Sequence, residues 1–260
     1  MSMNMYYFSA TGNSLMACKE LQKRSKDCSM QSIVKIGDED LIIPASNTVG
    51  LVFPVYFSGI PNKVAAFINK INFANVDYIF VVATKSQFPS PGNVTEQVND
   101  LLKRHNKKVN SVFYLNMIGN YIKMYNIADI GKQKAANIKA LKKLDRIAEV
   151  VQKKENVIEN PSPLLKFFWR NMYHSWKKNF RMSDSEFVSK GCNSCGLCVR
   201  ICPTQNISLT SNGPIWHHNC ETCFGCINVC PLKGIQCGKG TLNRSRYINP
   251  NISVEELLAR

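Results

Sequence analysis

A duplicated pattern of eight cysteines near the carboxyl end constrains this chain more than any other feature. Between Cys192 and Cys202, four cysteines are separated by two, two and three residues, and a proline follows the last. The same spacing, again closed by Cys-Pro, recurs between Cys220 and Cys230. The likeness continues past the cysteines, since an isoleucine stands at the same distance after each Cys-Pro pair. The pattern predicts a small, internally duplicated unit that binds metal through thiolates.

This spacing suits two 4Fe–4S clusters. Gaps of two residues let three successive thiolates surround one side of a cubane, and the Cys-Pro turn carries the fourth thiolate to the other cluster. The predicted ligands are Cys192, Cys195, Cys198 and Cys230 for cluster 1, and Cys202, Cys220, Cys223 and Cys226 for cluster 2. A pair of zinc sites is the alternative, but zinc requires neither a third close cysteine nor a Cys-Pro. Disulfides are less favoured than either.

At all eight ligand positions the segment resembles the bacterial-type ferredoxin with two 4Fe–4S clusters. A segment of about 50 residues is too small to bury a normal core, so bound clusters would hold it folded. The remaining cysteines, Cys18, Cys28 and Cys237, are expected to be structural thiols. Neither His217 nor His218 is expected to bind iron, because four cysteines already complete each cluster.

Composition narrows the class of protein. The 260 residues are 45% hydrophobic and 20% charged, which excludes a disordered or fibrous chain. No secretory signal or transmembrane segment is visible, and cluster ligands must stay reduced, so a soluble cytoplasmic protein is expected. The formal net charge of +15 indicates an acidic partner. A redox protein is favoured over nucleic acid, since no base-reading motif is present. The oligomeric state is not predicted.

The residues before the cysteines predict an α/β domain. Apolar runs indicate strands at 3–9, 32–36, 48–53, 78–84 and 109–116. Helical periodicity indicates helices at 15–26, 62–70, 94–104 and 127–154, the last of them ended by Pro161 and Pro163. This alternation predicts a doubly wound, five-stranded parallel sheet of order 2-1-3-4-5, with a ligand at the carboxyl ends of its strands.

The loop that follows the first strand is expected to hold a phosphate. Its amides and the following helix N-terminus point at an anion, its hydroxyls add donors, and its glycine permits a close approach. The expected contacts are Ser9, Thr11, Gly12, Asn13 and Ser14. At each defined position the loop resembles the Ser/Thr-x-Thr-Gly-x-Ser/Thr phosphate loop of flavodoxins, and the resemblance implies FMN. A Walker-type motif and a dinucleotide fingerprint are absent from the sequence.

An isoalloxazine ring needs flat apolar walls and amide contacts. The flavodoxin resemblance places these in the loops after the third and fourth strands. The first loop offers Pro54, Val55, Tyr56, Phe57, Ser58 and Gly59, and the second offers Thr84, Lys85, Phe88 and Gly92. The second loop departs from the flavodoxin pattern, because it lacks a Gly-Gly pair and carries a lysine. If that lysine lies near N1 of the flavin, it raises the reduction potential.

The two resemblances together identify a chain similar to the flavodoxin–ferredoxin fusion proteins of the EFR type. The expected parts are an FMN-binding domain (1–158), a basic and aromatic linker helix (159–190), a two-cluster ferredoxin domain (191–243) and a tail (244–260) with a short helix opened by a capping box. The aromatic face of residues 164–180 is expected to pack the domains together. Membrane-surface contact and partner docking are its alternatives.

The resemblance implies an electron-transfer protein in which FMN couples a two-electron partner to one-electron carriers. The external partner is expected to be an acidic ferredoxin, flavodoxin or reductase. The alternative is a flavin-dependent reductase of a small substrate. Tyr56, Tyr121 and Tyr125 are its candidate proton donors, although the sequence alone does not bring them together. A redox-sensing nucleic-acid binder is disfavoured.

Overall fold

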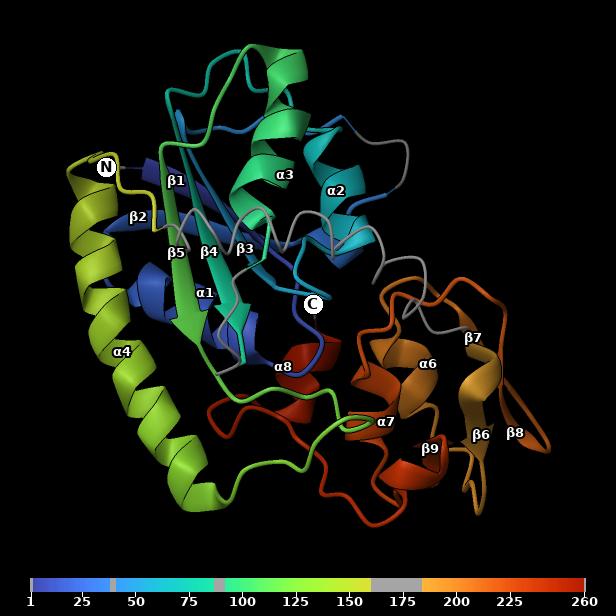
Figure 1. Ribbon diagram of the computed structural model, residues 1–260. Coiled ribbons are helices and arrows are strands. Elements are labelled where there is room, and N and C mark those ends of the chain that lie inside the picture. The colour runs from blue at the N-terminus through green and yellow to red at the C-terminus, as the bar shows by residue number, and fades with distance from the viewer. Residues whose placement is uncertain (1, 38–40, 87–91, 160–183, 260) are drawn as a thin grey trace.

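The computed structural model describes residues 2–37, 41–86, 92–159 and 184–259. Phe88 and the expected helix at 164–180 lie outside these residues. Five parallel strands form the centre of the amino-terminal part (Figure 1). They are β1 (Ser2–Tyr7), β2 (Asp27–Ser32), β3 (Thr48–Pro54), β4 (Tyr78–Lys85) and β5 (Ser111–Asn116). Their order is β2-β1-β3-β4-β5, so the predicted flavodoxin-like α/β fold is confirmed.

Helices cover both faces of this sheet. One face carries α1 (Asn13–Lys23) and α4 (Ile130–Gln152), and the other carries α2 (Asn62–Ile68) and α3 (Val94–Leu102). Because alternate strand residues point to opposite faces, Met5 packs with the first pair of helices and Tyr6 with the second. The central strands β3 and β4 are buried over nearly their whole length, which explains their unbroken apolar sequences.

The second strand lies earlier than the apolar pattern predicted. β2 is an edge strand of polar sequence, and its residues alternate between exposed and half-buried positions. The apolar run that suggested a strand at 32–36 instead opens a 3-10 turn (Ile33–Lys35), and Ile33 and Ile36 pack beneath the sheet. The prediction was wrong because an edge strand needs little apolar surface, whereas the following turn supplies it.

The long helix also ends before the prolines that were expected to end it. Lys154 adopts a left-handed conformation (φ 52°), and the amide of Glu155 donates to the carbonyl of Val150 at 3.1 Å. This geometry terminates α4 at Gln152. The chain then returns along β5, where the amide of Val112 donates to the carbonyl of Val157 at 2.9 Å.

The carboxy-terminal part contains two small antiparallel pairs and two short helices. β6 (Phe187–Ser189) pairs with β9 (Ile235–Cys237), and β7 (Ile207–Thr210) pairs with β8 (Gly213–Trp216). The helices are α6 (Leu197–Ile201) and α7 (Gly225–Val229), and single 3-10 turns occupy Asp184–Glu186 and Lys239–Thr241. A further 3-10 turn, Lys103–His105, follows α3 in the amino-terminal part. The tail ends in α8 (Val254–Leu258), and both hydrogen bonds of the predicted Ser253–Glu256 capping box are present.

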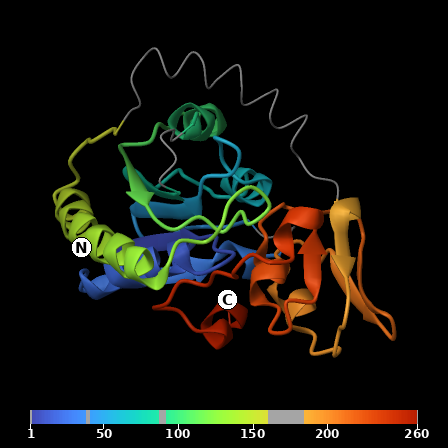
Figure 2. The same cartoon turned by 60° about the horizontal axis from the view of Figure 1, so that its bottom comes forward.

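The two parts share one hydrophobic core. Ile201 of α6, Ile227 of α7 and Leu257 of α8 belong to the same buried cluster as Leu15 and Met16 of α1. Figure 2 shows the orange and red carboxy-terminal part packed against the sheet-containing part. The cysteine-rich part therefore gains apolar burial by docking, where the sequence indicated that bound clusters alone would hold it folded. Among the described residues, no helix is long and apolar enough to cross a bilayer.

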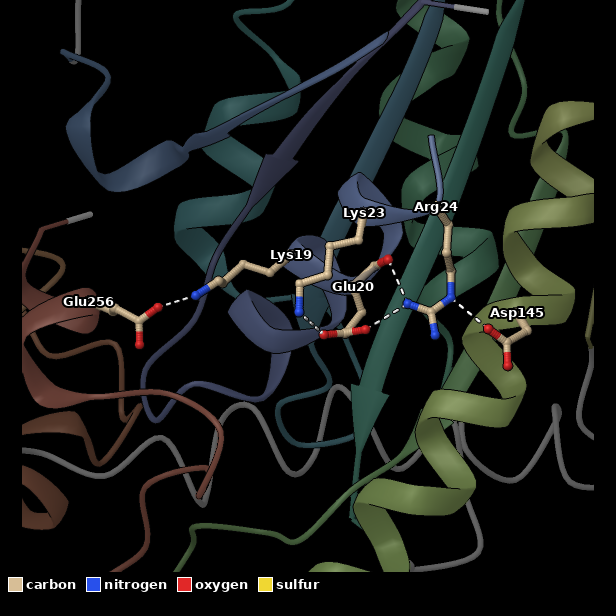
Figure 3. A network of polar contacts seen from close by, with 6 residues as sticks. All are labelled: Lys19, Glu20, Lys23, Arg24, Asp145 and Glu256. Carbon is tan, nitrogen blue, oxygen red and sulfur yellow. Dashed lines mark hydrogen bonds and ion pairs between the residues drawn. The ribbon is translucent and has the colours of Figure 1, made fainter. Parts of the chain in front are cut away.

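Polar contacts of α1 reach both the tail and α4 (Figure 3). Lys19 forms an ion pair with Glu256 of α8. Arg24, which directly follows α1, lies 2.7 Å from Glu20 of the same helix and 2.7 Å from Asp145 of α4. Partly exposed ion pairs contribute about 0–1 kcal/mol each, so these contacts orient α1 more than they stabilise the fold.

Candidate functional site

A cavity lies at the carboxyl end of the parallel sheet. Most of the residues predicted to contact FMN line it. These are Ser9, Thr11, Asn13, Ser14, Pro54, Val55, Tyr56, Phe57, Ser58, Thr84 and Lys85. Gly12, Gly59 and Gly92 were predicted with them but do not line the cavity, and Phe88 lies outside the described residues.

Two further segments line the cavity and were not predicted as a group. One is the loop after β5, which contributes Ile118, Gly119, Asn120, Tyr121, Met124 and Tyr125. The other is the second cysteine loop, which contributes Thr222. The first could have been inferred from its position after a parallel strand, since such loops meet at the carboxyl edge of the sheet. The second carries no sequence signal.

The loop that follows β1 is buried and holds its hydroxyls in place. Ser9, Thr11 and Ser14 are 2%, 4% and 1% exposed. The Gly12 amide donates to Ser9 Oγ at 3.1 Å, and Ser14 Oγ lies 2.9 Å from Thr84 Oγ1. Gly12 precedes α1 with φ 96° and provides no side-chain cap. The first-turn amides of α1 are therefore suited to an anion in the cavity.

The tail clamps this loop from behind. The Tyr247 hydroxyl donates to Asn13 Oδ1 at 2.7 Å, and Asn249 Nδ2 donates to the same oxygen at 3.0 Å. The Asn249 amide donates to the Thr11 carbonyl at 2.8 Å, and Asn13 Nδ2 donates to the Ile118 carbonyl at 2.8 Å. A Cβ at Gly12 would lie 3.0 Å from Asn249 Cβ, so the tail as well as the backbone angle requires glycine there.

The loop after β3 turns sharply at the cavity wall. Tyr56 and Gly59 exchange backbone hydrogen bonds of 2.9 Å, and Phe57 and Ser58 between them have positive φ angles of 48° and 62°. A Cβ at Gly92 would lie 1.9 Å from the Ser58 carbonyl oxygen. The two glycines thus shape the wall of the cavity without lining it. Two strained residues in succession are typical of ligand-binding loops.

The three tyrosines that the sequence could not bring together all line the cavity. The Phe57 and Tyr121 rings meet edge to face at 5.7 Å. Burial, followed by nearby acidic groups, raises the pKa of Tyr121 to about 12. Burial also raises the pKa of Tyr125, whose hydroxyl accepts a hydrogen bond from the Tyr121 amide at 3.2 Å. Both phenols remain protonated near neutral pH and can donate hydrogen bonds.

Lys85, which the sequence analysis predicted to contact the flavin, places a cationic side chain on the cavity wall. Its Nζ donates to the Ser86 carbonyl at 3.1 Å. Burial first, and then the charge of Lys143, lower its pKa from the ordinary value of 10.5. Lys143 is itself paired with Glu159 at 2.7 Å.

The eight cysteines of the repeat line two smaller cavities, four in each. One is lined by Cys192, Cys195, Cys198 and Cys230. The other is lined by Cys202, Cys220, Cys223 and Cys226. These are the two sets of four that the sequence assigned to clusters 1 and 2, and we call the cavities cluster-1 and cluster-2 cavities. All eight thiols are free of disulfides. Among the described residues, no group of three or more His, Cys, Asp or Glu is arranged to hold a single metal ion.

The two copies of the cysteine repeat are alike in structure as well as in sequence. In each copy, two backbone amides donate to cysteine sulfurs at equivalent positions. The pairs are Ser194 to Cys192 (3.3 Å) and Thr222 to Cys220 (3.3 Å), then Asn206 to Cys202 (3.2 Å) and Gly234 to Cys230 (3.3 Å). Such donors stabilise thiolate charge, as metal-binding sulfurs require.

A buried polar network supports the cluster-2 cavity. Asn206 donates from Nδ2 to Asp184 at 2.9 Å and accepts from the Asn219 amide at 2.6 Å, just before Cys220. His218 Nδ1 lies 2.6 Å from the other Asp184 oxygen, so this histidine has a structural partner. Burial would raise the pKa of Asp184, but the hydrogen bonds from Asn206 and His218 outweigh it and lower the pKa.

The unassigned thiols are mostly buried. Cys18 and Cys237 are 0% exposed, and Cys28 is half-buried on β2. Burial, with a smaller contribution from Cys28, raises the pKa of the Cys18 thiol. Buried thiols with raised pKa values are poor nucleophiles, as expected of structural cysteines.

The cluster-2 cavity adjoins the large cavity. Asn120, on the large cavity, donates from Nδ2 to the Cys223 carbonyl at 2.9 Å. Tyr121 meets the Phe224 ring edge to face at 4.7 Å, and Phe224 lines the cluster-2 cavity. The cluster-1 cavity lies on the outer side, where Cys192 and Cys195 are exposed. The three cavities therefore follow one another from the sheet to the surface.

The sequence matches no protein-family model and no curated protein. Its structure is similar to a flavodoxin of Megasphaera elsdenii, with 13% identity over 43% of this chain and 84% of the other, at a TM-score of 0.35. It is also similar to an azoreductase of Bacillus anthracis (10% identity, 57% and 99% coverage, TM-score 0.37). A third likeness is to rubredoxin oxygen:oxidoreductase of Desulfovibrio gigas (11% identity, 59% and 36% coverage, TM-score 0.37). The strand order β2-β1-β3-β4-β5 defines the fold independently of these likenesses.

Proposed function

We propose that this chain is an electron-transfer protein that binds FMN in the large cavity and a 4Fe–4S cluster in each cysteine cavity. The observation that carries the proposal is the succession of three cavities, each lined by the side chains that one of these groups requires. When bound, flavin exchanges one or two electrons and each cluster exchanges one, so the protein would link the two kinds of redox partner.

The residues of the large cavity fit FMN. The buried hydroxyls of Ser9, Thr11 and Ser14 and the uncapped start of α1 suit a phosphate held without a cation. The Phe57 ring and the tyrosines supply apolar walls with polar tips. Lys85 would place a positive charge on the same cavity.

The residues of the cysteine cavities fit iron–sulfur clusters. Four cysteine sulfurs line each cavity, and backbone amides already donate to some of them. Trp216 lines the cluster-2 cavity, and its buried Nε1 has no hydrogen-bond partner among the described residues. An indole N–H can only donate, and a cluster sulfur would be its acceptor.

The external partner would dock over the cluster-1 cavity. Cys192 and Cys195 are exposed there, and Leu232 beside them is 54% exposed. Lys190 and Lys233 are exposed, and the Lys190 amide donates to the Gly234 carbonyl at 3.0 Å, which brings their two segments together. An apolar contact with a basic rim suits an acidic redox protein, whose approach would be faster at low salt.

Cofactor analysis of the anaerobically purified protein tests the proposal. We expect one FMN and about eight irons per chain, and a redox titration that follows flavin and cluster spectra together would order the centres. Protein that binds zinc in place of iron, or that cannot be loaded with FMN, would overturn it. The Lys190→Glu, Lys233→Glu variant should transfer electrons more slowly to an acidic ferredoxin at low salt, and equal rates would exclude this docking surface.

One observation favours a second candidate, a flavin-dependent reductase of a small substrate. Tyr56, Tyr121 and Tyr125 all line the large cavity, where a phenol could deliver a proton to a bound substrate. The two functions separate on reduced protein. A carrier is reoxidised by ferredoxin, whereas a reductase is reoxidised by its substrate, and replacing Tyr121 with Phe should slow only the latter.

A further inference from the structure

We infer that Thr222, although it belongs to the cysteine repeat, is a hydrogen-bond partner of the FMN bound in the large cavity. This inference rests on the proposed function. It makes the cluster-2 loop part of the flavin site and couples FMN affinity to the assembly of cluster 2.

Thr222 stands in a loop that faces two cavities. Its neighbours Cys220 and Cys223 line the cluster-2 cavity, whereas Thr222 lines the large cavity. The side chain is 4% exposed. Asn120 Nδ2 donates to the Cys223 carbonyl at 2.9 Å, so the loop is fastened to the wall of the large cavity at the residue that follows Thr222.

The Thr222 hydroxyl forms no hydrogen bond to any other described residue. Its Oγ1 is buried without a hydrogen-bond partner, which is destabilising unless a ligand supplies one. The backbone amide of Thr222 already donates a hydrogen bond to Cys220 Sγ at 3.3 Å, so only the hydroxyl remains for a ligand. A hydroxyl both donates and accepts. It can therefore serve an oxygen or a nitrogen of FMN.

The internal repeat supplies the comparison that separates flavin binding from cluster binding. Ser194 occupies the equivalent position in the first copy. It has the same left-handed φ of 58°, and its amide makes the same 3.3 Å bond to a cysteine sulfur. Ser194 is exposed, however, and lies on the cluster-1 side, away from the large cavity. Holding a cluster therefore does not require a buried hydroxyl at this position, whereas the flavin side has one.

A second pair of equivalent positions differs in the same direction. Gly196 has φ 72°, and a Cβ there would have nothing within 4 Å. Its counterpart Phe224 is left-handed too, at 58°, but is 2% exposed and packs on Tyr121 of the large cavity. The second copy is thus adapted to the large cavity at two positions where the first copy faces solvent.

The coupling follows from the shared backbone. A cluster that binds Cys220 and Cys223 fixes the loop that carries Thr222 between them. FMN should bind more tightly when cluster 2 is present, and by linkage the cluster should be lost more slowly when FMN is bound.

Full-length, cluster-loaded protein provides the test. FMN is removed and its dissociation constant is measured by fluorescence titration for wild type, Thr222→Val, Thr222→Ser and Ser194→Ala, with iron content determined for each. We expect Thr222→Val to keep its iron and to bind FMN about two- to tenfold more weakly, the effect of one neutral hydrogen bond. Thr222→Ser and Ser194→Ala should bind FMN like wild type.

The flavin midpoint potential is a second readout. A shift in Thr222→Val assigns the contact to the ring, and weaker binding at an unchanged potential assigns it to the ribityl phosphate. Equal FMN affinity of wild type and Thr222→Val at equal iron content would overturn the inference, and Thr222→Ala replaces the valine variant if the latter loads iron poorly. Failure of wild-type protein to bind FMN or iron would instead refute the proposed function.

Discussion

Removing the Tyr247 hydroxyl should loosen the clamp that the tail places on the predicted phosphate loop. Tyr247 is 1% exposed, and its hydroxyl donates to Asn13 Oδ1 at 2.7 Å. Tyr78 provides a matched control. It is 2% exposed, and its hydroxyl donates to the Glu155 carbonyl at the same distance of 2.7 Å. It lies at the opposite, amino-terminal end of the parallel sheet.

The size of both expected effects, on the free energy of unfolding and on FMN affinity, follows from the hydrogen bonds that Tyr247 makes. In Tyr247→Phe the ring stays buried, and Asn13 Oδ1 keeps its bond from Asn249 Nδ2 at 3.0 Å, so no acceptor is orphaned. The loss is one neutral hydrogen bond, about 1 kcal/mol. Tyr78→Phe loses a bond of the same kind and also the 2.9 Å contact of the hydroxyl with Ser111 Oγ. The free energy of unfolding should therefore fall by about 1 kcal/mol in Tyr247→Phe and by at least as much in Tyr78→Phe. If the lost bond serves to hold the loop, Tyr247→Phe should also bind FMN about fivefold more weakly.

Urea unfolding and fluorescence titration with FMN measure the two effects separately. The unfolding midpoint should fall in both variants with an unchanged slope, whereas FMN affinity should fall only in Tyr247→Phe. Equal FMN affinities in the two variants would refute the idea that the tail organises the phosphate loop.

Three further predictions follow from the site. Cys195→Ala and Cys223→Ala should each retain about four irons per chain, and loss of all iron from either variant would contradict two separate ligand sets. Lys85→Met should lower the flavin midpoint potential, because it removes a positive charge from the cavity wall. Since burial lowers the pKa of Lys85, the difference from wild type should vanish as the pH rises through that lowered value; equal potentials at neutral pH would sink the prediction. Hydrogen bonds lower the pKa of Asp184 despite its burial, so its contribution to stability is full above the ordinary pKa of about 4 and is lost as the pH falls through the lowered value. Asp184→Asn should therefore unfold more easily than wild type near pH 7, by a margin that shrinks toward low pH in urea titrations.

Local patterns were sufficient to predict the sheet and the two cysteine sets. The central strands are apolar because both of their faces are buried, and the loop from Ser9 to Ser14 carries its own polar pattern. The order of the cysteines predicted which four share a cavity, since each Cys-Pro turn exchanges its cysteine with the other copy. The edge strand was misplaced because little of it is buried.

Contacts between distant parts of the chain could not be predicted in this way. Asn13 and Tyr247 are 234 residues apart, and neither has a local feature that indicates a hydrogen bond between them. The same is true of Thr222, whose role depends on which side of the duplicated unit docks on the sheet. The cysteine spacing is the same in both copies, so the spacing alone does not indicate which copy docks on the sheet.

Phe224 illustrates how docking breaks that symmetry. A bulky residue with positive φ costs about 1–3 kcal/mol, and full burial of a phenylalanine side chain contributes about 1.5–3 kcal/mol. On the exposed cluster-1 side there is nothing to bury against, and glycine stands at the equivalent position 196 with open space around it. On the cluster-2 side, Phe224 is buried between Tyr121 and Phe187, with ring centroids at 4.7 and 5.7 Å. The two energies nearly cancel, so stability alone does not account for a phenylalanine there. Its distinguishing effect is to fill the space between the two cavities, because Phe224 lines the cluster-2 cavity and contacts Tyr121 on the wall of the large cavity.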